Sequence, residues 1–194
     1  MNDFKKKMGK KIEQFSSEDY LDSYIRNEFL TDDGDADIYL KISSKDDLID
    51  NRTVNNQIDL RSEIFEFVEN KTALLDNDIK INLHIIGVKL SENEQIMIKN
   101  IFREHYAIEL FKIQKDYKNQ KEKVLSLFLI GCISLLSYLL LYLFTDFDFF
   151  LEVFGFIFSF ALWEAFDQLI YEISDTKFER EAISQNLLIE IIFD

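Results

Sequence analysis

The uncharged stretch at residues 124–144 constrains the fold of this chain more than any other feature. About 21 residues at ~1.5 Å rise make roughly 31 Å of helix, which matches a hydrocarbon core of about 30 Å. A short connector, residues 145–148, leads to a second, mostly apolar stretch at residues 149–166. We therefore predict a two-helix transmembrane hairpin. The alternative is a buried hairpin of a soluble protein, which has no need of so long an uncharged helix.

Basic residues predict the orientation of this hairpin. Lysines gather just before the first span, whereas the connector carries Asp146 and Asp148 and no basic residue. Because cytoplasmic flanks are enriched in lysine and arginine, both termini are expected to be cytoplasmic. No apolar segment opens the chain, so no cleavable signal is predicted, and the protein is expected to be a multi-pass protein of the cell (inner or plasma) membrane. The lysines are Lys112, Lys115, Lys118, Lys121 and Lys123.

Composition and motifs exclude several classes of function. The formal net charge is −14, and a strongly acidic chain lacks the basic face that nucleic acid requires. The single cysteine, Cys132, lies in the first apolar run, and two histidines are too few for most metal sites. Asp35 and Asp37 have the local form of a nucleotidyltransferase metal pair, but no Gly-Ser motif and helix precede them. We expect no enzymatic activity, no catalytic residue, no metal and no cofactor.

Residues 1–15 form a basic segment with an apolar helical stripe. Lysines surround the stripe, which suits a helix lying on anionic lipid. The alternative is a frayed tail or a helix packed on the domain that follows. The stripe consists of Phe4, Met8, Ile12 and Phe15.

Residues 16–123 are predicted to form a cytosolic α+β domain that ends in a stalk helix. Apolar residues at helical spacing indicate one helix over residues 18–30 and another over residues 60–75. Ser16 and Ser17 are suited to cap the first of these helices, and Asp59 is suited to cap the second.

Long helices are expected to join this domain to the hairpin. Ser91 and Glu94 form a capping box, and neither proline nor glycine interrupts the chain from there to Gly131. A second stalk helix is expected after residue 166, antiparallel to the first and complementary to it in charge. The pairing groups would be Lys112, Lys115, Lys118 and Lys121 on one helix and Glu172, Asp175, Glu179 and Glu181 on the other.

Three strands are predicted. Residues 37–42 and 79–85 alternate between apolar and polar, and residues 187–193 form an apolar run rich in isoleucine. An exposed apolar strand would invite aggregation, so residues 167–194 are expected to return to the domain and pair with both other strands. The predicted fold is thus an α+β domain with a small mixed sheet, joined by long helices to the hairpin. Residues 43–57 are expected to be loop.

Three acidic residues stand in or beside the second span: Glu152, Glu164 and Asp167. A carboxylate at membrane depth costs about 2.5–3.5 kcal/mol on insertion scales, so these residues are candidate membrane-embedded functional acids. Trp163 is a candidate interface anchor. The alternatives are that the span ends at Trp163, which leaves two carboxylates among headgroups, and that Glu152 snorkels outward.

Small residues recur in both spans and predict close packing of helices. Gly131 and Ser134 share a face of the first span, and Gly155 and Ser159 are four apart in the second. With the marginal length of the second span, they favour a homo-oligomer.

These features predict a non-enzymatic, two-span, membrane-anchored cytosolic module that binds or senses an unknown protein or small-molecule ligand. Its partners would be the lipid bilayer and other copies of the chain, with no nucleic acid. The rival interpretation is a membrane effector that forms a cation pore or disrupts the bilayer when its head is triggered, with the acidic residues facing a lumen.

Overall fold

The computed structural model describes residues 8, 11–13, 15, 17–50, 58–144 and 148–194. Most of the basic segment 1–15 and most of the connector 145–148 lie outside these residues. The chain divides into two compact units. We call residues 1–107 with 182–194 the head unit and residues 108–181 the hairpin unit, and each is described by itself.

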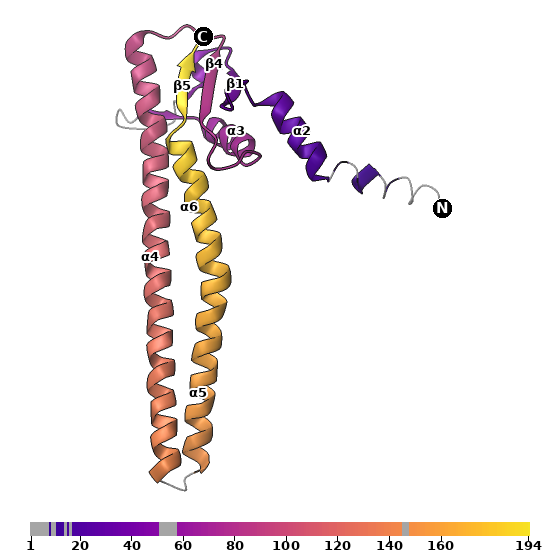
Figure 1. Ribbon diagram of the computed structural model, residues 1–194. Coiled ribbons are helices and arrows are strands. Elements are labelled where there is room, and N and C mark those ends of the chain that lie inside the picture. Colours follow the sequence, from indigo (N-terminus) through magenta and orange to yellow (C-terminus); the bar gives the residue numbers. More distant parts are fainter. Residues whose placement is uncertain (1–7, 9–10, 14, 16, 51–57, 145–147) are drawn as a thin grey trace. The chain divides into compact units, whose positions relative to one another are not determined.

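The head unit is built on a three-stranded sheet. Its strands are β1 (Ala36–Lys41), β4 (Ile81–Ile86) and β5 (Glu190–Phe193), in the order β1-β4-β5 (Figure 1). Both pairings are parallel, with Ile38 opposite Leu83 and Leu83 opposite Ile191. The sheet is therefore parallel rather than mixed. The terminal strand pairs with β4 alone, since β4 lies between it and β1.

One face of the sheet carries the core. Ile38, Leu83 and Ile191 are each at most 4% exposed. They belong to one cluster with residues of α3 (Ser62–Thr72) and of the first turns of α4 (Glu92–Phe144), including Phe65 and Tyr106. Burial, together with the charge of Glu69, raises the pKa of the Tyr106 phenol. The head thus has an ordinary hydrophobic core on one side of its sheet.

Local chemistry accounts for where the head helices begin. The helix α2 (Glu18–Glu28) starts as predicted, and Ser17 Oγ accepts a hydrogen bond from the Tyr20 amide. The start predicted for α3 is wrong, because Asp59 and Leu60 form β3 (Asp59–Leu60) and pair with β2 (Ile49–Asp50). Ladder formation displaces the helix to Ser62.

The predicted loop 43–57 is more ordered than expected where the structure describes it. It contains the 3-10 turn η1 (Lys45–Asp47) and strand β2. At its start, the Ile42 carbonyl approaches Gly87, which has φ +93°; a Cβ there would lie 2.7 Å from the Ile42 oxygen. Only glycine fits this turn without strain.

The helix α4 (Glu92–Phe144) is continuous over 53 residues, so the prediction of a single uninterrupted helix that includes the apolar run 124–144 is confirmed. Glu94 accepts hydrogen bonds from the Ser91 amide and hydroxyl at 2.8 and 2.7 Å. The bond from the amide is the half of a capping box in which the N3 carboxylate satisfies the N-cap N–H.

In the hairpin unit, α4 lies beside a second helical column (Figure 1). This column consists of α5 (Asp148–Asp167), the π-helical turn η2 (Gln168–Glu172) and α6 (Ile173–Leu187). Two helices of the chain are long and apolar enough to cross a membrane, and only 11% of the most apolar window of each is buried. Such exposure is unlike the core helix of a soluble protein.

Candidate functional site

A regular seam on α4 faces the second column of the hairpin unit. Buried and half-buried residues recur on it at alternating spacings of four and three. This is the heptad pattern of a coiled coil, in which one stripe of each helix meets its neighbour. The seam residues are Ile113, Tyr117, Gln120, Val124, Leu127, Gly131, Ser134, Tyr138 and Leu141.

Three of the predicted small residues lie where the two helices meet. A Cβ added to Gly131 would lie 3.7 Å from Ala161 Cβ, and one added to Gly155 would lie 3.7 Å from the Tyr138 ring. The Ser134 hydroxyl, 4% exposed as a residue, donates to the Phe154 carbonyl at 2.8 Å. Small side chains therefore permit close approach within a single hairpin.

The fourth small residue, Ser159, is placed differently. Its side chain is exposed, and its hydroxyl donates to the Gly155 carbonyl of its own helix at 2.9 Å. Gly155 and Ser159 therefore lie on different surfaces of the second column, although they are only four positions apart. Gly155 faces α4, whereas Ser159 is on the outside.

The contact of Gly131 with Ala161 fixes the level of Trp163. Residue 131 lies about two helical turns inside the first apolar run, so Trp163 also lies beside the interior of that run rather than beside its start. Trp163 is 72% exposed. Exposed apolar residues continue past it to Tyr171. The apolar surface of the second column is therefore longer than the predicted 149–166.

The candidate acids of α5 lie largely outside the seam. Glu152 and Asp167 are exposed, and Glu164 is half-buried. Glu164 Oε1 accepts a hydrogen bond of 3.2 Å from Gln168 Nε2. The structure thus leaves two carboxylates on the outer surface and ties the third to a neighbour on its own helix.

The sequence reasoning missed the π-helical turn η2. Buried residues of the second column follow the spacings four and three through Ala161, Ala165 and Gln168, but the next residue on this side is Ile173, five positions on. One extra residue has been accommodated as a wide turn. The signal in the sequence was this break in the heptad.

Gln168 lies at the start of that turn and is 1% exposed. Its Oε1 has no hydrogen-bond partner among the residues that the structure describes. An unpaired buried amide oxygen lowers the stability of a fold by about 1–3 kcal/mol. The helix pairing is therefore less stable at Gln168 than it would be with this oxygen hydrogen-bonded.

Among the residues that the structure describes, the stalk helices meet through contacts other than the predicted charge pairs. Thr176 Oγ1 donates to Gln120 Oε1 at 2.9 Å across the seam, and the Arg180 guanidinium lies 5.2 Å from the centre of the Tyr117 ring. A hydrogen bond with Lys121, reinforced by nearby positive charges, lowers the pKa of Tyr117. Three lysines pair instead with an acidic residue of their own helix: Lys112 with Glu109 and Lys118 with Glu122 on α4, and Lys177 with Glu181 on α6.

The head unit has a charged cluster on the sheet face opposite the core. His84 Nδ1 lies 2.8 Å from Asp194 Oδ2, and His84 Nε2 lies 3.6 Å from Asp37 Oδ1. Asn82 donates to Asp37 at 2.9 Å, and Tyr39 stacks on His84. Sequence reasoning did not bring these residues together, because the three segments that carry them are more than forty positions apart along the chain. The cluster ties the three strands to one another.

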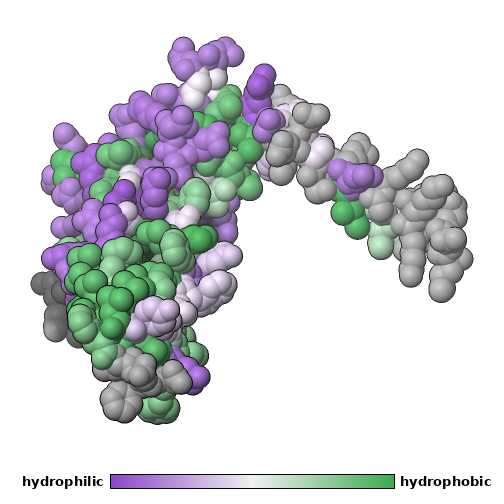
Figure 2. Space-filling model, turned by 60° about the horizontal axis from the view of Figure 1, so that its bottom comes forward, coloured by the Kyte–Doolittle hydropathy of each residue, from purple (hydrophilic) through white to green (hydrophobic). Residues whose placement is uncertain are grey.

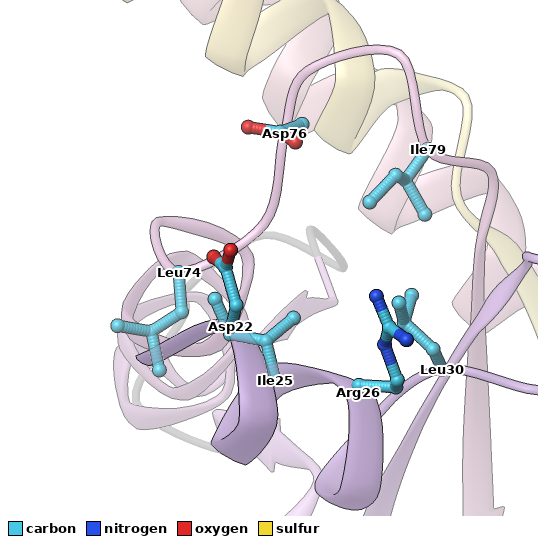
Figure 3. A pocket seen from close by; sticks show the side chains of 7 residues that line it. All are labelled: Asp22, Ile25, Arg26, Leu30, Leu74, Asp76 and Ile79. Carbon is cyan, nitrogen blue, oxygen red and sulfur yellow. The ribbon is translucent and has the colours of Figure 1, made fainter. Parts of the chain in front are cut away.

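A cavity of about 240 Å³ opens in the head unit between α2 and the loop that joins α3 to β4 (Figure 3). Three charged side chains surround it: Asp22 and Arg26 from α2, and Asp76 from the loop. Its apolar lining consists of Ile25, Leu30, Leu74 and Ile79. Sequence reasoning missed this cavity, because its two walls are about fifty residues apart.

Gln185 of α6 braces the loop wall. Its Nε2 donates to the Asp76 carbonyl at 2.7 Å and to the Ile79 carbonyl at 3.0 Å. Gln185 is 7% exposed, so this brace is part of the interior of the head unit.

No protein-family model, curated protein or solved structure matches this chain. Within the described ranges, no group of three or more histidine, cysteine or acidic residues could hold a metal ion. Function must therefore be argued from the two features above, the apolar hairpin and the charged cavity.

Proposed function

We propose that this chain is a two-span membrane protein whose head is a cytosolic binding or sensor module without enzymatic activity. One observation carries the membrane part. The hairpin unit pairs its two helices through a seam and leaves large apolar side chains on the outside, among them Phe128, Leu136 and Phe156, each at least 52% exposed. Figure 2 looks toward the connector end and shows hydrophobic residues over this surface.

The energetic argument favours lipid over water around this hairpin. Burying a large apolar side chain is worth about 1.5–3 kcal/mol, and contiguous apolar patches beyond a few hundred Å² are rare on soluble monomers. Both helices present such residues along their whole apolar length. Their backbone groups are paired within the helices, as a bilayer requires.

The binding role is supported by the head unit. It offers a cavity with charged and apolar walls, and the residues that line this cavity include no serine, threonine, cysteine or histidine. A pocket lined by apolar side chains with a few charges is typical of ligand binding. The cytosolic placement is proposed from the lysines before the first span and the acidic connector.

Topology is tested by thiol labelling. In a Cys132→Ser background, which has no other cysteine, Thr145→Cys places a thiol in the connector and Asn77→Cys places one in the head. A membrane-impermeant maleimide is expected to label Thr145→Cys in intact cells and Asn77→Cys only after permeabilisation. The reverse pattern, or loss of the protein from the membrane fraction after alkaline carbonate washing, contradicts the proposal.

Homo-oligomerisation is proposed from the outer surface of α5. Glu152 and Ser159 are exposed there, and a carboxylate at membrane depth needs a partner or water. Crosslinking in native membranes is expected to yield defined multimers. A protein that stays monomeric there and in several mild detergents contradicts assembly.

The same outward Glu152 and Asp167 support the rival function, a cation-conducting effector. Purified protein in liposomes distinguishes the two functions. A cation conductance that falls in Glu152→Gln favours the effector, whereas absence of conductance from an assembled protein leaves the anchored binding module.

A further inference from the structure

We infer that the cavity between α2 and the α3–β4 loop binds a small zwitterion, an α-amino acid with an apolar side chain. This inference rests on the proposed binding function of the head and names its ligand class. It follows from the charges around the cavity, from its apolar lining and volume, and from the brace behind its loop wall.

The charges around the cavity match the two charged groups of an amino acid. The Arg26 guanidinium suits the carboxylate, and the carboxylates of Asp22 and Asp76 suit the ammonium (Figure 3). Across the part of the chain that the structure describes, no ion pair or side-chain hydrogen bond uses these three charged groups. All three line the same cavity, so charges of both signs are available to one ligand.

The apolar lining supplies the third point of recognition. Ile25, Leu30 and Ile79 also pack against the core of the head, so this side of the cavity is held by the fold. The cavity volume of about 240 Å³ is below the ~300–1,000 Å³ of drug-sized sites, so the cavity suits a molecule of the size of leucine. Charged groups and apolar side chains around one small cavity fit an amino acid such as leucine or phenylalanine.

The brace gives bound ligand a route to the rest of the chain. A ligand that bridges Arg26 and Asp76 joins α2 to the loop that Gln185 holds. Gln185 belongs to α6, which runs without a break from Ile173. Occupancy of the cavity therefore bears on the helix that leads back from the hairpin.

The test uses the full chain in lipid nanodiscs and isothermal titration with L-leucine and L-phenylalanine. We expect saturable binding with a dissociation constant between about 1 µM and 1 mM. Three analogues test the points of recognition: 4-methylpentanoate lacks the ammonium, 3-methylbutylamine lacks the carboxylate, and glycine lacks the apolar chain. Each is expected to bind at least about tenfold more weakly, the factor that one lost interaction of ~1.4 kcal/mol produces.

Variants link binding to the cavity. Arg26→Gln and Asp22→Asn are expected to weaken leucine binding at least about tenfold without lowering the melting temperature, because both side chains are exposed. Arg103→Gln is the matched control, since Arg103 is an exposed arginine of the head away from the cavity, and its binding should equal that of the wild type.

Two results overturn the inference. One is the absence of saturable binding of either amino acid below about 1 mM. The other is binding that survives Arg26→Gln, or binding of 3-methylbutylamine as tight as that of leucine, which would indicate a plain cation site. Either result leaves the thiol-labelling outcome unchanged, so failure of this inference is separable from failure of the membrane topology.

Discussion

The Ser134 hydroxyl donates a hydrogen bond to the Phe154 carbonyl at 2.8 Å and so joins α4 to α5 within the apolar part of the hairpin. Ser137, one turn further along α4, donates to the Ile133 carbonyl of its own helix. Two serines in one span therefore have different structural roles. The first crosses the seam and the second does not.

Replacement of Ser134 by alanine should destabilise the pairing of the two helices. The expected loss is about 0.6–1.7 kcal/mol, the range measured for hydrogen bonds between membrane helices. Reversible unfolding in bicelles, with the degree of helix separation followed by fluorescence transfer, measures it. Ser137→Ala is the control and should be nearly neutral; equal losses for the two variants would show that the cross-seam bond contributes nothing.

Gly131 should tolerate alanine but not leucine. An added Cβ would meet Leu162 and Ala161 at 3.6 and 3.7 Å, an ordinary contact, whereas a leucine side chain has no room at this level. Overpacking of this kind costs about 1–3 kcal/mol. In the same unfolding measurement, the unfolding free energies of the wild type and Gly131→Ala should be similar, and that of Gly131→Leu should be lower. A stable Gly131→Leu hairpin would refute the close approach.

The terminal strand should be part of the stability of the head. Ile191 is 4% exposed and lies opposite Leu83, so Ile191→Ala is expected to cost about 2–5 kcal/mol. Ile192, which is only half-buried, provides a control of equal chemistry with a smaller expected loss. Thermal melting of the full chain, detected by proteolysis of the head unit, measures the loss of stability in both variants. An unchanged melting temperature in Ile191→Ala would show that β5 does not contribute to the core.

The start of α4 should lose stability in acid through Glu94. A hydrogen bond from Lys45, followed by those from Ser91, lowers the pKa of Glu94 from 4.5 to about 2. A carboxyl whose pKa is lower in the folded state stabilises the fold above the unfolded pKa, and this contribution disappears as pH falls through the folded pKa. The difference in stability between wild type and Glu94→Gln should therefore be full above pH 4.5 and vanish toward pH 2.

Urea unfolding of the two proteins across this pH range measures the difference. Glu92→Gln serves as the matched control, because Glu92 is an exposed acid in the same first turn outside the capping box. A Glu94→Gln variant with the pH profile of the wild type would contradict the assignment.

The spacing of apolar residues and the capping residues predicted those helices and strands that depend mainly on local sequence. Ser17 caps α2, the Ser91 and Glu94 box starts α4, and the three strands form close to their predicted positions. The prediction that Asp59 caps a helix was wrong, because Asp59 can either cap a helix or join a strand. Pairing with the partner strand β2 favours the strand. A partner distant in sequence is invisible to a local pattern.

The candidate sites were predictable only as residue types. The register of the hairpin depends on which side chain meets Gly131, and this contact placed Trp163 deeper beside the first run than the sequence suggested. The cavity depends on the docking of α2 near a loop about fifty residues away. Both are tertiary contacts, which composition and spacing do not encode.

The wide turn at Gln168–Glu172 also determines how the hairpin unit would respond to a one-residue deletion. Deleting one residue there would shorten the five-residue step from Gln168 to Ile173 to four residues, the step that a regular heptad takes at this point, and would restore an ordinary α-helix. Ile173 and Thr176 would then stay on the side of the column that faces α4, and the bond from the Thr176 hydroxyl to Gln120 would need a shift of only about 1.5 Å along the helix axis. The wide turn thus takes up a single inserted residue locally, and the buried side of the second column in the hairpin unit follows spacings of four and three both before and after it.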